Sequence, residues 1–484
     1  MKRYERHADE IAQLIHSGAL QPGDRIPSVR EASRTRGISP STVFEAYYLL
    51  EAQGLIHARP RSGYYVSTQL PAAQDARPAE PQPSRPAPNS TDVAISDLVF
   101  EVLGLARDPD LVPLGSAFPG LELFPLDRLA RCLASGMRKL DPWSIVQSLP
   151  PGDGRLRQQI ALRYGLHGRA VDTEEIVVTN GAMEALNLCL EAVARPGDVV
   201  VVESPTFYAA LQALERLNLQ ALEIATHPRE GIDLNALADA LAHHPVKACW
   251  LMPSFQNPLG ALMPEDKKRD LIALLARHKV PLIEDDVYGE LHFAPQRPPP
   301  AKAFDTEGLV MHCSSFSKSL APGYRVGWVA AGRFATAVQR LKLMTTLSAA
   351  TPSQQALSEY LAQGGYDRHL RHLRRCLAQQ QALALAAVAR HFPPGTRVSR
   401  PEGGYFLWVE LPAQVDALLL HRRALEHGIS LAPGQIFSAD RRFANCVRIN
   451  YGHPAQSRFE AALATVGALA TALAEAATGN PRAA

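Results

Sequence analysis

The chain has 484 residues, of which 46% are hydrophobic and 20% are charged, and its formal net charge is +2. A chain of this length is too long for one ordinary core, so we expect two or three domains with the composition of soluble globular protein. A charge this close to balance gives no overall electrostatic case for binding nucleic acid, which must come from local placement of basic residues.

The sequence also argues against a membrane or secreted protein. No uninterrupted apolar run is long enough to span a bilayer, and the charged segment 1–6 is not followed by the apolar stretch of a secretory signal. The six cysteines are scattered and form no Cys-x-x-Cys motif. We therefore expect free thiols in a reducing cytoplasm, with neither a disulfide framework nor a structural metal site.

The first seventy residues predict three helices and a hairpin. Apolar residues between Ala8 and Ile15 share one helical face, and Ser28 is placed to cap a second helix that ends near Arg36. Ser39 or Ser41 is placed to cap a third helix, and two short strands, 54–56 and 63–66, follow it. This order is typical of a winged helix-turn-helix, whose third helix enters the major groove of DNA.

Basic and hydroxyl side chains fall where such a module meets DNA. The candidate contacts are Arg30, Ser41, Thr42 and, on the predicted hairpin, Arg59 and Arg61. On the pattern alone, a small helical interaction domain with solvated arginines is the alternative. Residues 68–91 then contain six prolines among Ala, Gln and Ser, which predicts an extended, flexible linker and a domain boundary.

From about residue 170 the pattern alternates between short apolar runs and helical stretches. The runs are 176–179, 199–203, 248–253, 281–285, 309–314 and 326–331. This alternation predicts a mostly parallel sheet with crossover helices, in which ligands collect at the carboxyl ends of the strands.

The stretch Ser314–Trp328 follows one of these runs and carries the most specific chemistry. Ser315 and Ser317 lie beside Lys318, and Arg325 follows a turn later. Short hydroxyl donors and a guanidinium suit a phosphate dianion, and a partly desolvated lysine can attack a carbonyl as the free amine. Phosphate binding next to a Schiff-base lysine is the requirement of pyridoxal 5′-phosphate (PLP). A solvated loop lysine is the alternative.

Four further motifs follow predicted strands, and each has a structural alternative. The turn Gly181-Ala182-Met183 can present backbone N–H groups to a phosphate, or can be an ordinary strand–helix turn. Phe207 can stack on a ring or fill the core. Asn257 can donate to a phenolate oxygen or form an Asn-Pro turn. In Asp285-Asp286-Val287-Tyr288, Asp285 can hold a pyridinium proton or cap a helix.

Two resemblances cover most of the chain. Gly18–Arg30, Ser39–Val43, Gly54–Ile56 and Arg61–Tyr64 resemble the GntR-type regulators, which implies the DNA contacts named above. Pro40 stands where that family often has an arginine, so we expect no phosphate or base contact from position 40.

The ordered series from Gly181-Ala182 to Arg448 resembles the fold type I aminotransferases. That resemblance implies that Lys318 forms the Schiff base, Asp285 pairs with the pyridine nitrogen, and Asn257 and Tyr288 flank the phenolate. It implies that the phosphate is bound by Ser315, Ser317, Arg325 and the turn Gly181-Ala182-Met183, and that Phe207 stacks on the ring. It also implies that Arg448 binds a substrate or effector carboxylate and that Asn257 lies near the substrate. Leu149 stands where many relatives have a tyrosine that reaches the phosphate of the neighbouring subunit, so that contact is expected to be missing.

Together, the parts resemble MocR-type transcriptional regulators. The expected fold is an N-terminal winged helix-turn-helix (1–67), a linker (68–91), and an α/β fold type I domain (92–484) with large (about 110–345) and small (about 350–475) subdomains. The implied function is a cytoplasmic, homodimeric, PLP-dependent regulator that binds double-stranded DNA and senses an amino acid or amine through an external aldimine. The alternatives are an active aminotransferase carrying a DNA-binding module, and a PLP-free dimerisation body.

Overall fold

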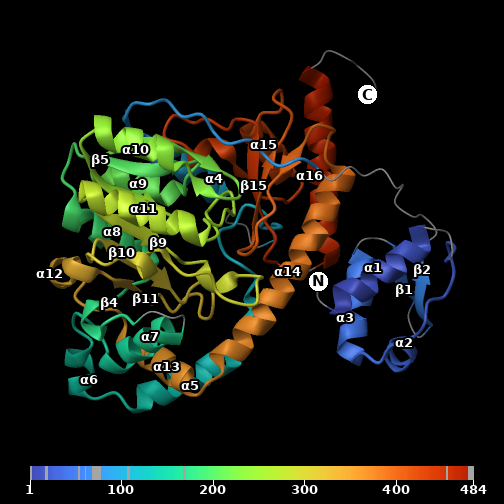
Figure 1. Cartoon of the computed structure of the whole chain (residues 1–484), viewed down its shortest axis with the longest axis horizontal. Coiled ribbons are helices and arrows are strands. Elements are labelled where there is room, and N and C mark those ends of the chain that lie inside the picture. Colours follow the sequence, from blue (N-terminus) through green and yellow to red (C-terminus); the bar gives the residue numbers. More distant parts are fainter. Residues whose placement is uncertain are drawn as a thin grey trace.

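A computed structural model gives the fold of the chain (Figure 1). It describes residues 3–16, 20–52, 55–59, 62–67, 78–105, 110–166, 170–453 and 456–477. We call residues 3–67 the head, residues 78–92 the arm, and residues 93–477 the body. The head lies beside the body, next to one long helix of the body (Figure 1).

The head has three helices and a two-stranded hairpin, in the predicted order. Its elements are α1 (Arg3–His16), α2 (Val29–Arg36), α3 (Pro40–Ala52), β1 (Ile56–Arg59) and β2 (Gly63–Val66). Ser28 Oγ accepts a hydrogen bond from Glu31 N at 3.2 Å, and Ser39 Oγ accepts one from Thr42 N at 3.2 Å, so Ser39 caps α3. The first strand begins at Ile56 and runs to Arg59, later than predicted, because Ile56 pairs with Val66 and Arg59 with Gly63.

The helices of the head enclose a small core. One face of α3 is buried through Val43, Ala46, Tyr47 and Leu50. These side chains pack against Ala8, Ile11 and Ile15 of α1, and against residues of the hairpin. The opposite face of α3 is therefore the face that a partner can reach.

The arm corrects the prediction of a flexible linker over 68–91. Ala79 O accepts from Val398 N at 2.9 Å, and Ser84 Oγ donates to Ser204 O at 2.6 Å. At its end, β3 (Thr91–Asp92) adds an antiparallel strand to the central sheet of the body. Proline suits this role because it favours an extended backbone whose carbonyls stay free to accept bonds. Residues 68–77 of the predicted linker lie outside the described residues.

The central sheet has nine strands, in the order β3-β6-β5-β8-β9-β10-β11-β4, with β7 paired to β6. Strands β6, β5, β8, β9 and β10 are parallel, and β11 is antiparallel to both of its neighbours. The bounds are β4 Ile176–Thr179, β5 Val199–Ser204, β6 Gln220–His227, β7 Gly231–Ile232, β8 Val246–Leu251, β9 Leu282–Asp285, β10 Val310–Ser315 and β11 Gly327–Ala330.

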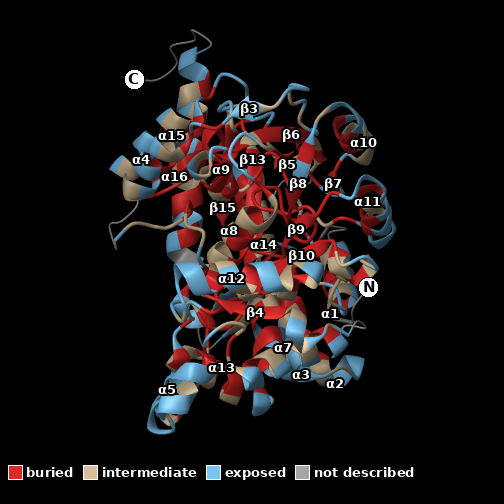
Figure 2. Cartoon of the chain, turned by 90° about the vertical axis from the view of Figure 1, so that its left-hand side faces the viewer, coloured by how far each residue is buried: buried red, intermediate tan, exposed pale blue. Residues whose placement is uncertain are grey.

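Helices cover both faces of this sheet, and the strands themselves are buried (Figure 2). The helices of this part are α4 (Ser96–Leu105), α5 (Leu126–Arg138), α6 (Pro142–Gln147), α7 (Gly154–Leu166), α8 (Ala182–Val193), α9 (Tyr208–Arg216), α10 (Leu234–His243), α11 (Glu265–His278), α12 (Ala335–Thr345) and α13 (Thr351–Ala362). Short 3-10 turns lie at Leu121–Leu123, Thr173–Glu175, Gly289–Leu291, Ala301–Phe304, Gly332–Phe334 and Gly434–Phe437.

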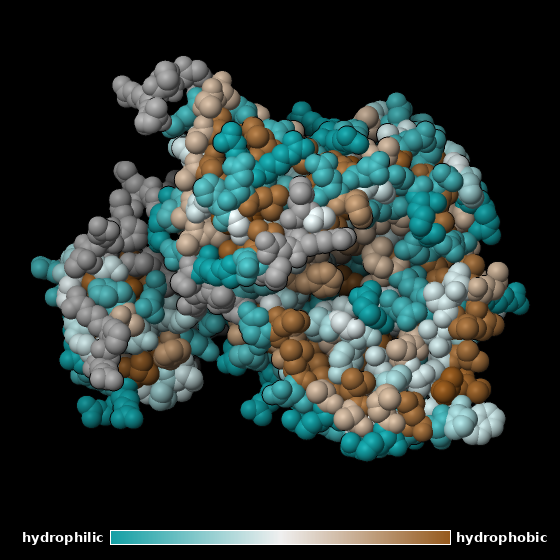
Figure 3. All heavy atoms as spheres, turned by 180° about the vertical axis from the view of Figure 1, so that it is seen from behind, coloured by the Kyte–Doolittle hydropathy of each residue, from teal (hydrophilic) through white to brown (hydrophobic). Residues whose placement is uncertain are grey.

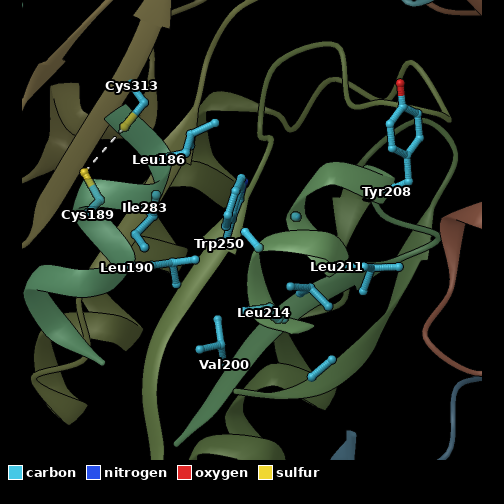
Figure 4. Close-up of a cluster of buried hydrophobic side chains, with 14 of the residues drawn as sticks. Leu186, Cys189, Leu190, Val200, Tyr208, Leu211, Leu214, Trp250, Ile283 and Cys313 are labelled. Atoms are coloured by element: carbon cyan, nitrogen blue, oxygen red, sulfur yellow. Dashed lines mark hydrogen bonds between the residues drawn. The ribbon is translucent and has the colours of Figure 1, made fainter. Parts of the chain in front are cut away.

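The core beneath α8 is tightly filled. Trp250 of β8 and Ile283 of β9 meet Leu186 and Leu190 of α8, as Figure 4 shows. Cys189 and Cys313 come together there with their sulfurs 3.6 Å apart, as two free thiols. This dry core fixes α8 against the strands whose ends carry the predicted site.

A second, four-stranded sheet forms the C-terminal subdomain. It has the order β12-β13-β15-β14, with β12 Arg397–Val398, β13 Phe406–Glu410, β14 Ala432–Pro433 and β15 Cys446–Asn450. Its helices are α14 (Tyr366–His391), α15 (Ala417–Glu426) and α16 (Gln456–Ala477). By length and composition alone α16 could cross a membrane, but Phe459, Leu463 and Val466 on it are buried in the core of this subdomain.

Packing divides the body differently from the predicted boundaries near 110 and 350. Leu114 and Phe124 pack with the C-terminal subdomain, so the start of the body belongs with its end. Leu357 and Tyr360 of α13 pack with α5 and α7 of the large subdomain. The large subdomain therefore extends past the predicted boundary near 350, because the apolar face of α13 packs against its helices.

Candidate functional site

The predicted cofactor residues meet at the carboxyl ends of β9 and β10. Lys318 follows β10 by three residues and is half-buried. Its Nζ donates to Ala117 O at 2.7 Å and lies 3.9 Å from the centroid of the Phe118 ring. Lys318 therefore points into the interior beside the segment Gly115–Phe118, which sequence reasoning did not identify.

The surroundings of Lys318 favour its neutral amine. Burial first, and then the positive charges of Arg448 and Arg325, lower the pKa of Lys318 to about 7, against Asp285, which raises it. An amine with a pKa near neutrality is partly unprotonated at physiological pH. Such an amine can attack an aldehyde carbon, as the sequence predicted.

Asp285 ends β9 and is 1% exposed. Its Oδ1 is buried without a hydrogen-bond partner among the described residues. Burial, and then the neighbouring charge of Asp286, raise the pKa of Asp285 to about 7. A buried carboxylate oxygen with no donor fits a ligand that brings its own N–H group, as a pyridinium ring does.

Asn257 and Arg448 form one pair deep in the same site. Arg448 is fully buried, and its Nη1 donates to Asn257 Oδ1 at 3.0 Å while its Nη2 donates to Gly115 O at 2.7 Å. Asn257 Nδ2 and Arg448 Nε have no partner among the described residues. These two donors suit acceptor oxygens of a bound molecule, a phenolate for the amide and a carboxylate for the guanidinium.

Tyr288 is the other predicted neighbour of the phenolate. It is buried, its ring centroid lies 5.4 Å from that of Tyr405, and burial raises its pKa. It is therefore a neutral phenol that can donate a hydrogen bond. Tyr405, whose hydroxyl donates to Ala117 O at 2.9 Å, was not predicted.

The predicted phosphate residues form a cradle at the start of α8. Gly181 has φ +83°, a conformation that favours glycine, and a Cβ there would lie 2.6 Å from Arg325 Nη2 and push the guanidinium away. Arg325 donates to Asn180 O at 3.4 Å and to Ser317 Oγ at 3.5 Å. These long contacts leave the guanidinium available to an anion held by the N–H groups of Gly181, Ala182 and Met183.

The remaining cradle and ring residues lie close by. Ser315 and Ser317 are both buried, and Ser315 Oγ accepts from Ser317 N at 3.4 Å. Phe207 precedes α9 and packs between the cores of the two subdomains, as does Ala182. The geometry therefore keeps both alternatives for Phe207, ring stacking and core packing.

In the head, Ser39 Oγ lies 2.9 Å from Ser41 Oγ and 2.8 Å from Thr42 Oγ1, so three hydroxyls cluster at the start of α3. Arg30 is exposed on α2. Arg61 and the side chain of Arg59, the predicted wing contacts, lie outside the described residues.

Comparison with known proteins identifies both parts. Residues 142–464 match the family model described as aminotransferase class I and II, and residues 3–66 match the bacterial regulatory proteins of the gntR family. Both fold predictions are confirmed. The chain belongs to the aminotransferase class I and II family and carries a gntR-family domain at its N-terminal side, the organisation predicted as MocR-type.

Individual relatives show the same organisation. The chain is 49% identical over 469 residues to the HTH-type transcriptional regulator YdcR of Escherichia coli K12, covering 97% of this chain and 99% of YdcR. It is 37% identical to YjiR of the same organism, over 96% of this chain and 98% of YjiR. The names of both describe them as uncharacterized.

The body also resembles solved enzymes. The structure of LysN, the α-aminoadipate aminotransferase of Thermus thermophilus complexed with N-(5′-phosphopyridoxyl)-L-leucine, matches with a TM-score of 0.71 and 28% identity, over 79% of this chain and all of LysN. The fold and the unpartnered donors and acceptors of the site both fit PLP, which is the cofactor of this fold.

Proposed function

We propose that the protein is a PLP-dependent transcriptional regulator that binds double-stranded DNA through the head and senses an amino acid or amine in the body. The observation that carries the sensing half is that Asp285 Oδ1, Asn257 Nδ2 and Arg448 Nε are buried with no hydrogen-bond partner in the described part of the chain. The gntR-family head supports the DNA-binding half.

Each residue would contribute a defined part. Lys318 would hold the cofactor covalently, the Arg325–Gly181 cradle would bind its phosphate, and Asp285 would accept from its ring nitrogen. When bound, PLP supplies an electrophilic carbon and an electron-withdrawing ring to an amine. Arg448 would orient the carboxylate of that amine through a charge-assisted hydrogen bond.

The lowered pKa of Lys318 and the buried Arg448 also favour a second function, transamination. A regulator needs only to bind its effector, whereas an aminotransferase must also move a proton and accept a 2-oxo acid. Rapid multiple turnover with amino and oxo acids by a protein that binds no duplex would support the enzyme over the regulator.

A cytoplasmic homodimer is part of the proposal. Apolar side chains are exposed around α6, with Trp143 70% and Ile145 61% exposed, and with Val146 and Leu149 beside them. Figure 3 shows apolar surface over the lower part of the body, where α5 and α6 lie. An apolar patch of this kind suits a second copy of the chain. The free cysteines suit a reducing compartment.

Borohydride reduction tests the cofactor half directly. Reduction of the protein with bound PLP should fix a pyridoxyl group on the peptide that contains Lys318. Lys268 is an internal comparison, because it is fully buried and its pKa is likewise lowered, to about 8, yet it donates to Ser254 Oγ and Pro299 O away from the site. Label on Lys268, or equal labelling of wild type and Lys318→Ala, would contradict the assignment.

A further inference from the structure

The face of α3 that faces away from the core of the head lies next to the body at Glu45 and Tyr48, while Ser41 at its start is exposed. Residues 41, 45 and 48 share this face, because they are spaced by four and three along the helix. Glu45 on this face lies 3.8 Å from Arg375 of α14, between Oε1 and Nη1. Figure 1 shows α3 beside α14, and α-carbon contacts between these two helices agree.

This face is the one that a recognition helix presents to the major groove. A groove-reading helix buries one side in its own domain and inserts the other between the DNA backbones. In α3 the domain side is Val43, Ala46, Tyr47 and Leu50, so the groove side includes Glu45 and Tyr48. Because α14 occupies the space in front of Glu45, a duplex cannot follow that side past Ser41, which stays exposed, while the head is in this position.

The contact between the head and α14 is loosely packed. A cavity of about 660 Å³ lies between the head and α14, with Tyr4, Glu45 and Leu49 on one side and Phe293, Arg371 and Ala378 on the other. Arg375 and Glu45 are 65% and 31% exposed, so their ion pair is weak. A loosely packed contact with an exposed ion pair can open at small cost.

Helix α14 also forms hydrogen bonds with the residue that follows the cofactor lysine. Tyr366 OH, in the first turn of α14, lies 2.8 Å from Ser319 Oγ, and His369 Nε2 lies 2.9 Å from Ser319 O. Ser319 directly follows Lys318. Beyond His369, further along the same rigid helix, α14 meets the head near Arg371 and Arg375.

We propose that α14 is a docking surface for the groove-reading face of α3. In this structure the head is therefore docked in a position that excludes DNA, and the loop that carries Lys318 controls how strongly α14 binds the head. This inference rests on the proposed function. Docking lowers the apparent DNA affinity by the fraction of molecules whose head is docked. Ligands in the body then act on DNA binding only through a different affinity for the docked and undocked states.

The test compares two charge reversals in the full chain with bound PLP. Arg375→Glu should repel Glu45 and tighten binding of a labelled mixed-sequence duplex, on the order of two- to fivefold at low salt. Arg390→Glu is the matched control, because Arg390 is an exposed arginine of the same helix paired with Glu460, away from the head. Both variants change the net charge equally, and a new carboxylate at position 375, being nearer the head, would repel DNA at least as strongly as one at position 390, so tighter binding by Arg375→Glu cannot come from charge alone.

The outcomes separate the two hypotheses. Tighter binding by Arg375→Glu alone, with a larger radius of gyration in X-ray scattering, supports docking. Equal binding by the two variants, or weaker binding by Arg375→Glu, overturns it and would instead fit a phosphate contact from Arg375. If wild type and both variants all fail to bind duplex, the DNA-binding function itself is wrong. Tyr366→Phe, which removes only the hydroxyl bonded to Ser319, should reduce the difference in duplex affinity between the PLP-loaded and the PLP-free protein, and an unchanged difference would overturn the link between docking and the Lys318 loop.

Discussion

Asp285 and Asp286 are consecutive carboxylates whose pKa values are displaced in opposite directions. Asp285 has an oxygen without a partner and a pKa raised by burial to about 7. Burial would also raise the pKa of Asp286, but Arg297 and His312 hold it below its ordinary value, with His312 Nε2 2.9 Å from Asp286 Oδ2. Asp286 therefore stays ionised through the contacts of its Oδ2 with Arg297 and His312, although its Oδ1, like Asp285 Oδ1, has no hydrogen-bond partner among the described residues.

This difference predicts a pH dependence of stability in the PLP-free protein. The folded-state pKa of Asp285 lies above its value of about 3.9 in an unfolded chain, so the folded state holds an extra proton between about pH 4 and pH 7. The free energy of unfolding should fall as the pH rises through this range. Asp285→Asn should remove that fall, making the variant more stable relative to wild type at pH 8 than at pH 5.

Urea unfolding of both proteins at pH 5 and pH 8 gives the change in their difference in free energy of unfolding. We expect this change to be a few kcal/mol, since each pKa unit of displacement corresponds to about 1.4 kcal/mol. The lowered pKa of Lys318 adds stability as the pH rises above about 7 in both proteins, so the comparison largely cancels it. A stability difference that does not change with pH would show that Asp285 is already ionised in the PLP-free fold.

The phosphate cradle predicts a contrast between two glycines. Gly181 and Gly197 both have positive φ, +83° and +91°, so an alanine strains the backbone at either position. Only at Gly181 would the added Cβ also meet the Arg325 guanidinium, while Gly197 has open space. Gly181→Ala should weaken PLP binding by about tenfold or more, roughly the 1.4 kcal/mol of one lost contact. Equal PLP affinities of the two variants, measured by fluorescence titration, would remove Arg325 and Gly181 from the phosphate site.

Arg448 predicts selectivity among effectors. Replacement by Gln removes the buried guanidinium that faces the site, so compounds with an amine and a carboxylate should bind about ten- to a hundredfold more weakly. Amines without a carboxylate should be affected much less. Absorbance titration of PLP-loaded protein measures both classes, with Arg397→Gln as a control on strand β12 of the same sheet, where Arg397 pairs with Glu410. An equal loss for both classes would mean that Arg448 only positions Asn257.

The head predicts a salt effect. Arg30 is exposed on α2, and if it contacts a phosphate, Arg30→Ala should weaken binding to all duplex sequences and reduce the salt slope of log K by about one. Arg397→Ala, in the body, is the control. Fluorescence anisotropy at several salt concentrations gives the slope, and an unchanged slope would place Arg30 away from the DNA backbone.

Sequence reasoning located most of this site because its residues directly follow strands, and those strands are predicted from short apolar runs. Lys318, Asp285 and Asn257 come together because parallel strands present their carboxyl ends at one edge. The segment Gly115–Phe118 gave no such signal, since its hydrogen bonds to Lys318 and Arg448 come from backbone carbonyls, which any residue type supplies, and the ring of Phe118 over Lys318 belongs to no recognisable motif.

The arm was misjudged for a related reason. Its composition is that of a linker, and nothing local shows that Val398 and Ser204, far along the chain, will bond to it. The contact between Glu45 and Arg375 was equally invisible, because a sequence pattern gives the faces of a helix but not the partner that covers them.

The anchoring of the arm on the body limits how far the head can move away from the body. The arm is fixed from Pro78 onward, where Arg400 Nη2 donates to Pro78 O at 2.8 Å, and the described part of the head ends at Ser67. A tether between these points spans at most about 40 Å when fully extended. That reach is close to one helical turn of B-DNA, about 34–36 Å. A head released from the body can therefore shift by about one helical turn along DNA, so the spacing of the repeats in an operator should tolerate inserted base pairs up to that reach and no further.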